Sequence, residues 1–217
     1  MLIRAYHIIE NELIDLFNYI EPHDRNLKTF SHKTYELLLR ASTEFETNCR
    51  SILTDNNYRK SPEDMNIIDY NKINISSKLS EYSVIMETWS SGEKTFIPFK
   101  DWTVSGKNLG WYQSYNYVKH NRNTKFREAS FSNLLNAVAG LFVVLFSQFF
   151  VSVFNPYQTD VSGFNFKLND GSIYGDASLF RINCPKTWTD SDKYDFLWHD
   201  IKGKRKPFAC FNFLASA

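Results

Sequence analysis

Three side chains that lie close together in the sequence carry the functional groups of acid–base and phosphate chemistry. Lys119, His120 and Arg122 belong to a local basic region, since residues 103–159 contain five basic and one acidic side chain. A neutral imidazole accepts a proton near pH 7, and ammonium and guanidinium groups stabilise negative charge on phosphate oxygens. A metal-independent ribonuclease needs both, a base for the ribose 2′-hydroxyl and cations for the charge that develops on phosphorus. We therefore predict that His120 is a general base and that Lys119 and Arg122 bind phosphate.

The segment that carries these groups has the pattern of a helix from position 111 to about position 120. Because residues four and seven or eight positions apart share a helix face, Tyr112 and Asn116 lie on the same face as Lys119 or His120. We predict that this face is polar and that Tyr112 and Asn116 position a substrate. The opposite, buried face is predicted to consist of Trp111, Tyr115 and Val118. The alternative is structural: Asn116 and His120 cap the helix, and the two cations are solvated.

An earlier helix, predicted from residue 31 to about residue 53, carries charged side chains that could orient His120. If this helix packs beside the helix that ends near position 120, Arg40, Glu44 and Glu46 come within reach of the imidazole. The alternative is again structural, because Arg40 and Glu44 belong to a ladder of charges spaced four residues apart. Such a ladder is usually a solvated face with weak ion pairs.

The sequence contains none of the common metal or cofactor motifs. Its five histidines include no H-x-x-x-H or H-E-x-x-H spacing, and its three cysteines never form a C-x-x-C pair. It also has no G-x-G-x-x-G, no Walker A motif and no G-x-S-x-G, so we expect no metal and no cofactor. Unpaired cysteines favour a reducing compartment, and we expect a cytoplasmic protein.

Hydrophobic periodicity predicts a mainly α-helical fold with a smaller β-containing part. Helices are predicted over residues 1–20, 31–53 and 111–120, and from about residue 130 until Pro156 closes the last one. Short β-like segments are predicted in a hairpin near 82–102 and later over residues 163–168, 178–182 and 208–213. We predict a helical domain over residues 1–157, with the hairpin as an insertion, and a strand-rich extension over residues 158–217 packed on it.

One uncharged segment allows two interpretations. Residues 130–159 contain no charged side chain, and Leu134–Phe154 is long enough to span a bilayer. However, Asn136 and Gln148 interrupt the segment with amide groups that need partners in hydrocarbon, and the centre of a helical bundle also requires a helix that is apolar on all sides. We favour a buried core helix and expect no membrane contact. The alternative is a membrane-tethered protein.

Two stretches of the sequence carry a family resemblance. The string YNYVKHNR at Tyr115–Arg122 is followed by Phe126, Ala129 and NLLNA, and the string LLLRASTEFE lies earlier at Leu37–Glu46. Over residues 30–150 these features resemble uncharacterised bacterial proteins of the HEPN superfamily. The resemblance implies a HEPN-like helical bundle that forms a homodimer. It also implies a relation to the RNases of toxin–antitoxin, abortive-infection and other phage-defence systems.

HEPN nucleases typically carry an arginine, then a polar residue, and then a histidine four to six positions further on. Arg122 and Asn123 begin such a motif, but no histidine follows them. The formal match to this spacing is the set Arg25, Asn26 and His32, which lies in a loop and at the start of the second predicted helix. We therefore include Arg25, Asn26 and His32 as a second candidate motif.

The candidate residues and the resemblance together predict an RNA-directed protein of a bacterial defence or toxin system. As an enzyme it would be a metal-independent endoribonuclease, and its expected partners are RNA, a second copy of itself and a protein of the same system. The alternative is a non-catalytic interaction module in which the polar cluster around His120 is a structural network.

Overall fold

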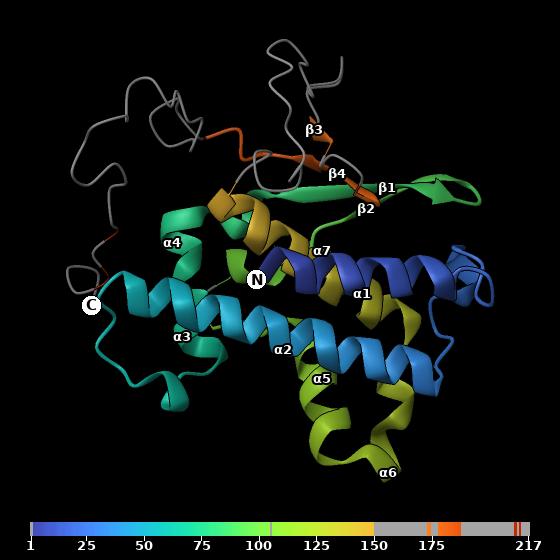
Figure 1. Cartoon of the computed structure of the whole chain (residues 1–217), viewed down its shortest axis with the longest axis horizontal. Helices are drawn as coiled ribbons and strands as arrows, with labels where there is room; N and C mark the ends of the chain where they lie inside the picture. Colours follow the sequence, from blue (N-terminus) through green and yellow to red (C-terminus); the bar gives the residue numbers. More distant parts are fainter. Residues whose placement is uncertain are drawn as a thin grey trace.

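The structure is a computed structural model that describes residues 2–104, 106–149, 173–174, 178–187, 211 and 213. It confirms a mainly helical fold with a small antiparallel sheet (Figure 1). The helices and strands are α1 (Leu2–Leu16), α2 (His32–Asp55), α3 (Ile67–Asn71), α4 (Ile73–Ser77), β1 (Ser83–Trp89), β2 (Gly92–Phe96), α5 (Gly110–His120), α6 (Arg122–Lys125), α7 (Phe131–Phe149), β3 (Ile173–Tyr174) and β4 (Phe180–Asn183).

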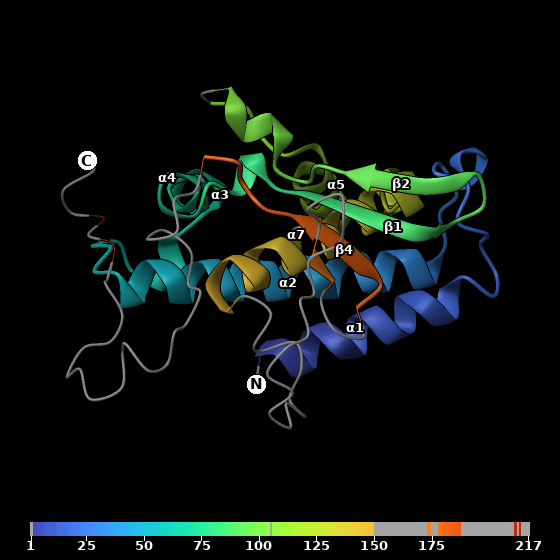
Figure 2. The same ribbon diagram turned by 90° about the horizontal axis from the view of Figure 1, so that it is seen from above.

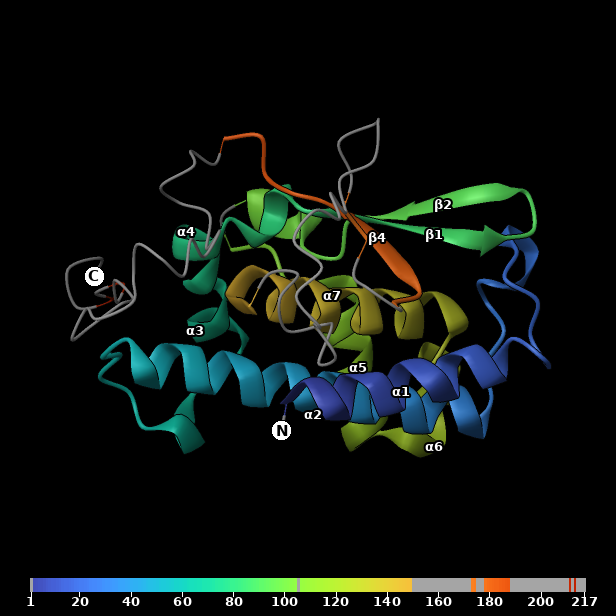
Figure 3. The ribbon, with the colours of Figure 1, turned by 45° about the horizontal axis from the view of Figure 1, so that its top comes forward.

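Helix α7 forms the centre of the fold. It lies between the sheet on one side and helices α1, α2 and α5 on the other (Figures 1 and 3). All its residues from Leu134 to Ser147 except Asn136 are buried. On the sheet side, the Phe142 ring lies 5.7 Å from the Phe180 ring of β4. The part of the uncharged segment that the structure describes, up to Phe149, thus forms the core of a layered fold.

The composition of α7 is also that of a membrane span. By length and hydropathy Phe131–Phe149 is a candidate span, and 78% of its most apolar window is buried inside the protein. The amide of Asn136 donates to the Ser132 carbonyl at 2.9 Å, and the amide of Gln148 donates to the Val144 carbonyl at 3.1 Å. The polar groups that interrupt the segment therefore find partners within the helix itself, and its burial agrees with a core helix.

Helix α2 begins where the sequence predicts. Ser31 is its N-cap and accepts a hydrogen bond from the backbone N–H of Thr34, while the Thr34 hydroxyl accepts one from the N–H of Ser31. This reciprocal pair satisfies two backbone donors that the first turn leaves open. The side chain of Ser31 therefore fixes the start of α2 at His32.

The sheet combines two parts of the chain that the sequence analysis assigned to different domains. The predicted hairpin is present as β1 and β2, joined by the turn at Ser90 and Ser91. Strand β4 pairs with the other edge of β1 (Figure 2), and β3 pairs with β4, which gives the order β2-β1-β4-β3. The predicted strand over 178–182 is confirmed by β4. The strand over 163–168, most of 208–213 and the boundary at 157/158 lie outside the described residues.

A buried carboxylate attaches the segment before β4 to α1. Glu10 is 2% exposed, and its Oε1 accepts hydrogen bonds from the Ser178 hydroxyl at 2.8 Å and from the backbone N–H of Leu179 at 2.7 Å. The hydroxyl of Tyr6 donates to the same oxygen at 2.7 Å. Because buried carboxylates are retained only where such donors surround them, Glu10 fixes the position at which β4 begins.

Candidate functional site

The predicted basic residues lie on the surface at the end of α5 and just beyond it. We call Lys119, His120, Arg122, Lys125 and Arg127 the basic face; all five are exposed. Helix α5 ends at His120 because the backbone of Asn121 leaves the helical conformation, with φ −134° and ψ 46°. Helix α6 projects away from the layers (Figure 1). Of the acidic side chains, only Glu128 belongs to the same stretch of sequence. The basic face is therefore a local concentration of positive charge.

The buried face of α5 is the one predicted, with one addition. Trp111, Tyr115 and Val118 are buried, as expected, but Tyr112 is also buried, at 5% exposed. Its hydroxyl donates to Oε1 of Glu46 at 2.6 Å across the α2–α5 contact. The placement of Tyr112 on the polar face was wrong, because its hydroxyl finds a buried carboxylate on the neighbouring helix.

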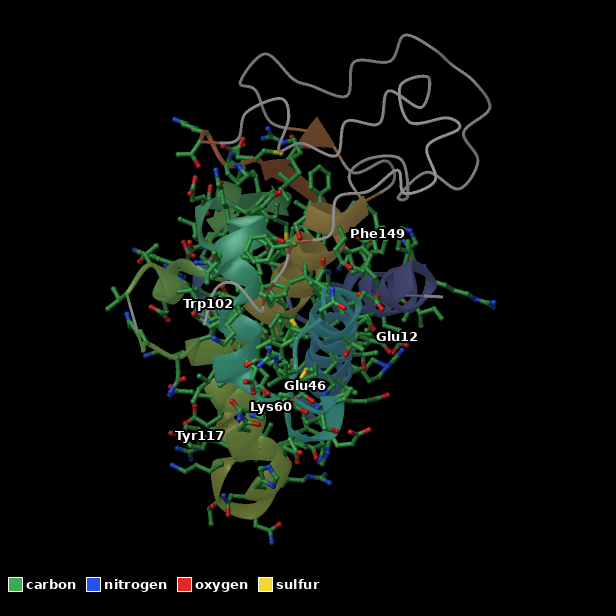
Figure 4. The ribbon with its side chains drawn as sticks, turned by 90° about the vertical axis from the view of Figure 1, so that its left-hand side faces the viewer. Glu12, Glu46, Lys60, Trp102, Tyr117 and Phe149 are labelled. Carbon is green, nitrogen blue, oxygen red and sulfur yellow. The ribbon has the colours of Figure 1, made fainter. Side chains whose placement is uncertain are left out.

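Burial also sets the chemistry of the Tyr112 and Glu46 pair. Burial and the hydrogen bond to Glu46 both raise the pKa of Tyr112 far above its usual value. Glu46, at 7% exposed, faces the interior between the helices, whereas Tyr117 lies at the outer surface (Figure 4). Tyr112 is therefore a neutral hydrogen-bond donor in the core and offers no ring to a ligand.

The side chain of Lys119 folds back along α5 and contacts Tyr115. Its Nζ donates to the hydroxyl oxygen of Tyr115 at 2.8 Å and lies 5.0 Å from the centroid of the same ring. The hydrogen bond that Lys119 donates to Tyr115 raises the pKa of Lys119, so the ammonium stays protonated at neutral pH. Lys119 thus keeps its charge on the basic face but already has one partner.

His120 does not receive the expected support from α2. It is exposed, and its side chain has no hydrogen bond or ion pair with any residue that the structure describes. Arg40 pairs instead with Glu12 of α1 at 2.5 Å. The prediction that Arg40 orients His120 is therefore wrong. In the described ranges, the side chains of Asn116 and Glu44 likewise make no hydrogen bond to His120.

Arg122 contacts a residue from the other predicted motif. Its Nη2 lies 3.0 Å from Nδ1 of His32, a residue 90 positions earlier in the sequence. The Cζ atom of Arg122 lies 4.8 Å from the ring centroid of Tyr35 and 5.8 Å from that of Phe126. The imidazole of His32 is itself 4.9 Å from the Phe126 ring. Two aromatic rings and an imidazole therefore surround the guanidinium group.

The loop before α2 brings these residues together. Phe30 forms an isolated antiparallel bridge with Ser130, and the N–H of Phe131 donates to the Thr29 carbonyl at 2.7 Å. These backbone bonds fasten the loop to the start of α7. As a result the first turn of α2 lies beside α6, and His32 meets Arg122. No local sequence pattern predicts the contact of His32 with Arg122, because it depends on these long-range backbone bonds between the loop and the start of α7.

The other two members of the second motif have a local role. The Asn26 amide donates to the Glu21 carbonyl at 2.9 Å, and the backbone N–H of Arg25 donates to Nδ1 of His23 at 3.0 Å. These bonds shape the turn between α1 and α2. No hydrogen bond within the described ranges joins either residue to His32, so the motif does not assemble as a unit.

The arrangement can bind anions and exchange protons. The cations of the basic face suit phosphate oxygens, and the imidazole of His120 suits proton transfer. No group of three or more His, Cys, Asp or Glu side chains within the described residues could hold a metal ion. The chain matches no model of a known protein family, no curated protein and no solved structure.

Proposed function

We propose that the chain is a HEPN-like protein that binds RNA through its basic face and cleaves it without a metal ion. The observation that carries this proposal is the basic face itself, which concentrates four cations and an exposed imidazole at the end of α5, in α6 and in the short 3-10 turn Phe126–Glu128 after it. Within the described residues, neither Lys125 nor Arg127 forms an ion pair with an acidic side chain. Unpaired cations on one face supply the electrostatic part of nucleic-acid affinity.

An exposed aromatic ring among these cations supports RNA as the ligand. Tyr117 is 46% exposed, and Nζ of Lys125 lies 5.4 Å from its ring centroid. Unpaired bases stack on such rings, and the stacking is tolerant of sequence. The resemblance of Tyr115–Arg122 to HEPN proteins points in the same direction.

The cleavage step follows from the chemistry of RNA. His120 takes the proton of a ribose 2′-hydroxyl, and the 2′-oxygen attacks the adjacent phosphorus. The bond between phosphorus and the 5′-oxygen breaks, the departing oxygen takes a proton from water, and a 2′,3′-cyclic phosphate remains. Arg122 and Lys119 stabilise the charge that develops on the phosphate oxygens. In this proposal the protein acts as a homodimer in the cytoplasm of a bacterial cell, within a defence or toxin system.

Cleavage in the presence of EDTA tests the enzyme directly. Purified protein is incubated with end-labelled RNA in EDTA, and products are tested for the cyclic phosphate. Loss of a general base costs roughly 10²- to 10⁴-fold in rate, which is the effect expected of His120→Ala. The matched control is His23→Ala, because His23 caps a turn away from the basic face. Intact RNA with the wild type, or equal rates for both variants, contradicts the enzyme.

A non-catalytic interaction module is the second candidate function. It is favoured by the internal contacts of Tyr112 with Glu46, of Lys119 with Tyr115 and of Arg122 with His32. In this case the basic face binds RNA or an acidic protein without cleaving it. Binding of RNA that stays intact, with no effect of His120→Ala, would favour this candidate.

A further inference from the structure

The contact between Arg122 and His32 fixes which nitrogen of the imidazole carries the hydrogen. A guanidinium group has only N–H donors, so Nδ1 of His32 must accept from Nη2 of Arg122. In a neutral imidazole the other nitrogen then carries the hydrogen. Nε2 of His32 is therefore a hydrogen-bond donor and not a base. The two side chains present donors only, which is the set that a phosphate oxygen needs.

Arg122 is held in place before any ligand arrives. Its guanidinium lies within cation–π distance of two rings, Tyr35 at 4.8 Å and Phe126 at 5.8 Å. Its remaining N–H groups make no hydrogen bond to any residue that the structure describes. Holding a long side chain in this way lowers the entropy that binding would otherwise cost. The pair is therefore preorganised for an anion.

An exposed ring lies next to these donors. Phe30 is 40% exposed, and its ring packs edge to face on Phe126 with the centroids 5.7 Å apart. The His32 ring contacts the same Phe126 at 4.9 Å. Phe30 and His32 thus both contact Phe126, and the backbone bridge from Phe30 to Ser130 holds the ring in position. A nucleotide needs this combination, with donors for its phosphate beside an exposed ring for its base.

We propose that Arg122, His32 and Phe30 form a subsite for one nucleotide of a single strand. Nε2 of His32 donates to an oxygen of one phosphate, the free N–H groups of Arg122 donate to the neighbouring phosphate of the strand, and Phe30 stacks on the base between them. The inference rests on the proposed RNA function and adds the class of substrate. The faces of paired bases are covered by their neighbours in a duplex, so the subsite favours unpaired RNA.

Two substitutions of His32 separate its two nitrogens. An asparagine oxygen can replace Nδ1 as the acceptor for Arg122 but offers no donor at the position of Nε2. A glutamine amide reaches that position and restores the donor. We measure the anisotropy of a labelled single-stranded RNA and of its duplex in EDTA. We expect His32→Asn to weaken single-strand binding about 10- to 150-fold. His32→Gln keeps the donor but loses the acceptor for Arg122, so we expect it to weaken binding less than His32→Asn.

Substitutions of Phe30 test the stacking. Phe30→Leu keeps an apolar side chain and should weaken single-strand binding about 5- to 100-fold, with duplex binding unchanged. Phe30→Trp keeps a ring and should restore binding, which separates stacking from loss of fold. The charge control is Arg59→Gln, because Arg59 is exposed and lies beyond the opposite end of α2 from His32. It should change single-strand binding little compared with Arg122→Gln.

The outcomes distinguish the subsite from the proposed function. If RNA binds but His32→Asn and Phe30→Leu bind it like the wild type, the subsite is wrong and the basic face still binds RNA. Equal weakening of single-strand and duplex binding by Phe30→Leu also overturns the stacking. If the wild type binds neither RNA, the proposed function fails together with the subsite.

Discussion

At the scale of single residues, the groups of the candidate site divide into exposed and buried side chains. The side chains of Lys119, His120 and Arg122 are exposed, as a ligand site requires. Tyr112 was assigned to the same face because four-residue spacing treats a tyrosine near a face boundary as polar. Its ring is buried and its hydroxyl reaches Glu46, a residue 66 positions away. Only tertiary packing decides between these two placements.

The buried contact between Tyr112 and Glu46 predicts a change in stability without a change in ligand binding. Tyr112→Phe leaves the carboxylate with one donor fewer in a dry environment, so the free energy of unfolding should fall by ~1–3 kcal/mol. The control is Tyr117→Phe, whose hydroxyl has no hydrogen bond within the described residues; it should change stability little. Urea unfolding measures both. Equal stabilities for the two variants would contradict the buried hydrogen bond.

The carboxylate of Asp69 predicts a stability difference that depends on pH. It accepts hydrogen bonds from the Tyr58 hydroxyl and from Nζ of Lys60, both at 2.7 Å. Burial opposes the charge, but the donors of Lys60, Asn66 and Tyr58 outweigh burial and lower the pKa of Asp69. Burial, together with the bond to Asp69, raises the pKa of Tyr58 to about 12.

A carboxylate whose pKa is lower in the folded state stabilises the protein above the unfolded value and loses that effect as pH falls. Asp69→Asn should therefore lower the free energy of unfolding by ~1–3 kcal/mol at neutral pH. The deficit relative to the wild type should shrink as the pH falls below ~4, the unfolded pKa of aspartate. Urea unfolding at both pH values measures this, and a deficit that stays constant with pH would exclude the ionised carboxylate as its cause.

At the scale of elements, local sequence patterns were sufficient to predict those helices and strands whose defining contacts join residues close together in the sequence. The start of α2 followed from Ser31, and the β1–β2 hairpin followed from alternation around the turn at Ser90 and Ser91. Strand β4 was predicted as a strand, but its pairing with β1 was not, because the paired residues Val84 and Ile182 lie 98 positions apart in the sequence. The placement of β4 also involves packing on α7, where the ring of Phe180 contacts that of Phe142.

The close approach of α5 to α7 predicts an effect of one added methyl group. A Cβ on Gly140 would lie 3.1 Å from Cζ2 of Trp111, which is held by a hydrogen bond from its Nε1 to the Pro98 carbonyl at 2.9 Å. Gly140→Ala gains ~1 kcal/mol of helix propensity but overpacks this contact at a cost of ~1–3 kcal/mol. We expect a net loss, measured by thermal unfolding. Gly110→Ala is the control, because a Cβ there meets nothing within 4 Å; a gain at both sites would contradict the tight contact.

At the scale of the whole molecule, Glu10 joins the helical layers to the strand that completes the sheet. Glu10→Gln replaces a charged acceptor of three short hydrogen bonds with a weaker one, at a cost of ~1–3 kcal/mol. Amide exchange over residues 178–183 should become faster than in the wild type, while exchange in α2 changes less. Asp15→Asn, on the exposed side of α1, serves as the control. Unchanged exchange over 178–183 would show that Glu10 does not hold this segment.

The fold class was predictable because the sequence separates helical from β-like periodicity over long stretches. The candidate site was predictable only in part, because the contact of Arg122 with His32 requires α2, α6 and the loop at Phe30 to meet. The claim on which the functional account depends is that the basic face binds RNA.

Salt dependence of RNA affinity tests that claim most directly. For single strands the logarithm of the binding constant falls with the logarithm of salt concentration by ~0.7 per phosphate contact. The double variant Lys125→Gln, Arg127→Gln should weaken binding and make the slope less steep by ~1.4 than in the wild type. The double variant Arg59→Gln, Lys100→Gln, which removes two exposed cations outside the basic face, should leave the slope unchanged. Equal slopes for the wild type and the basic-face variant, or no RNA binding by the wild type at low salt, would contradict the account.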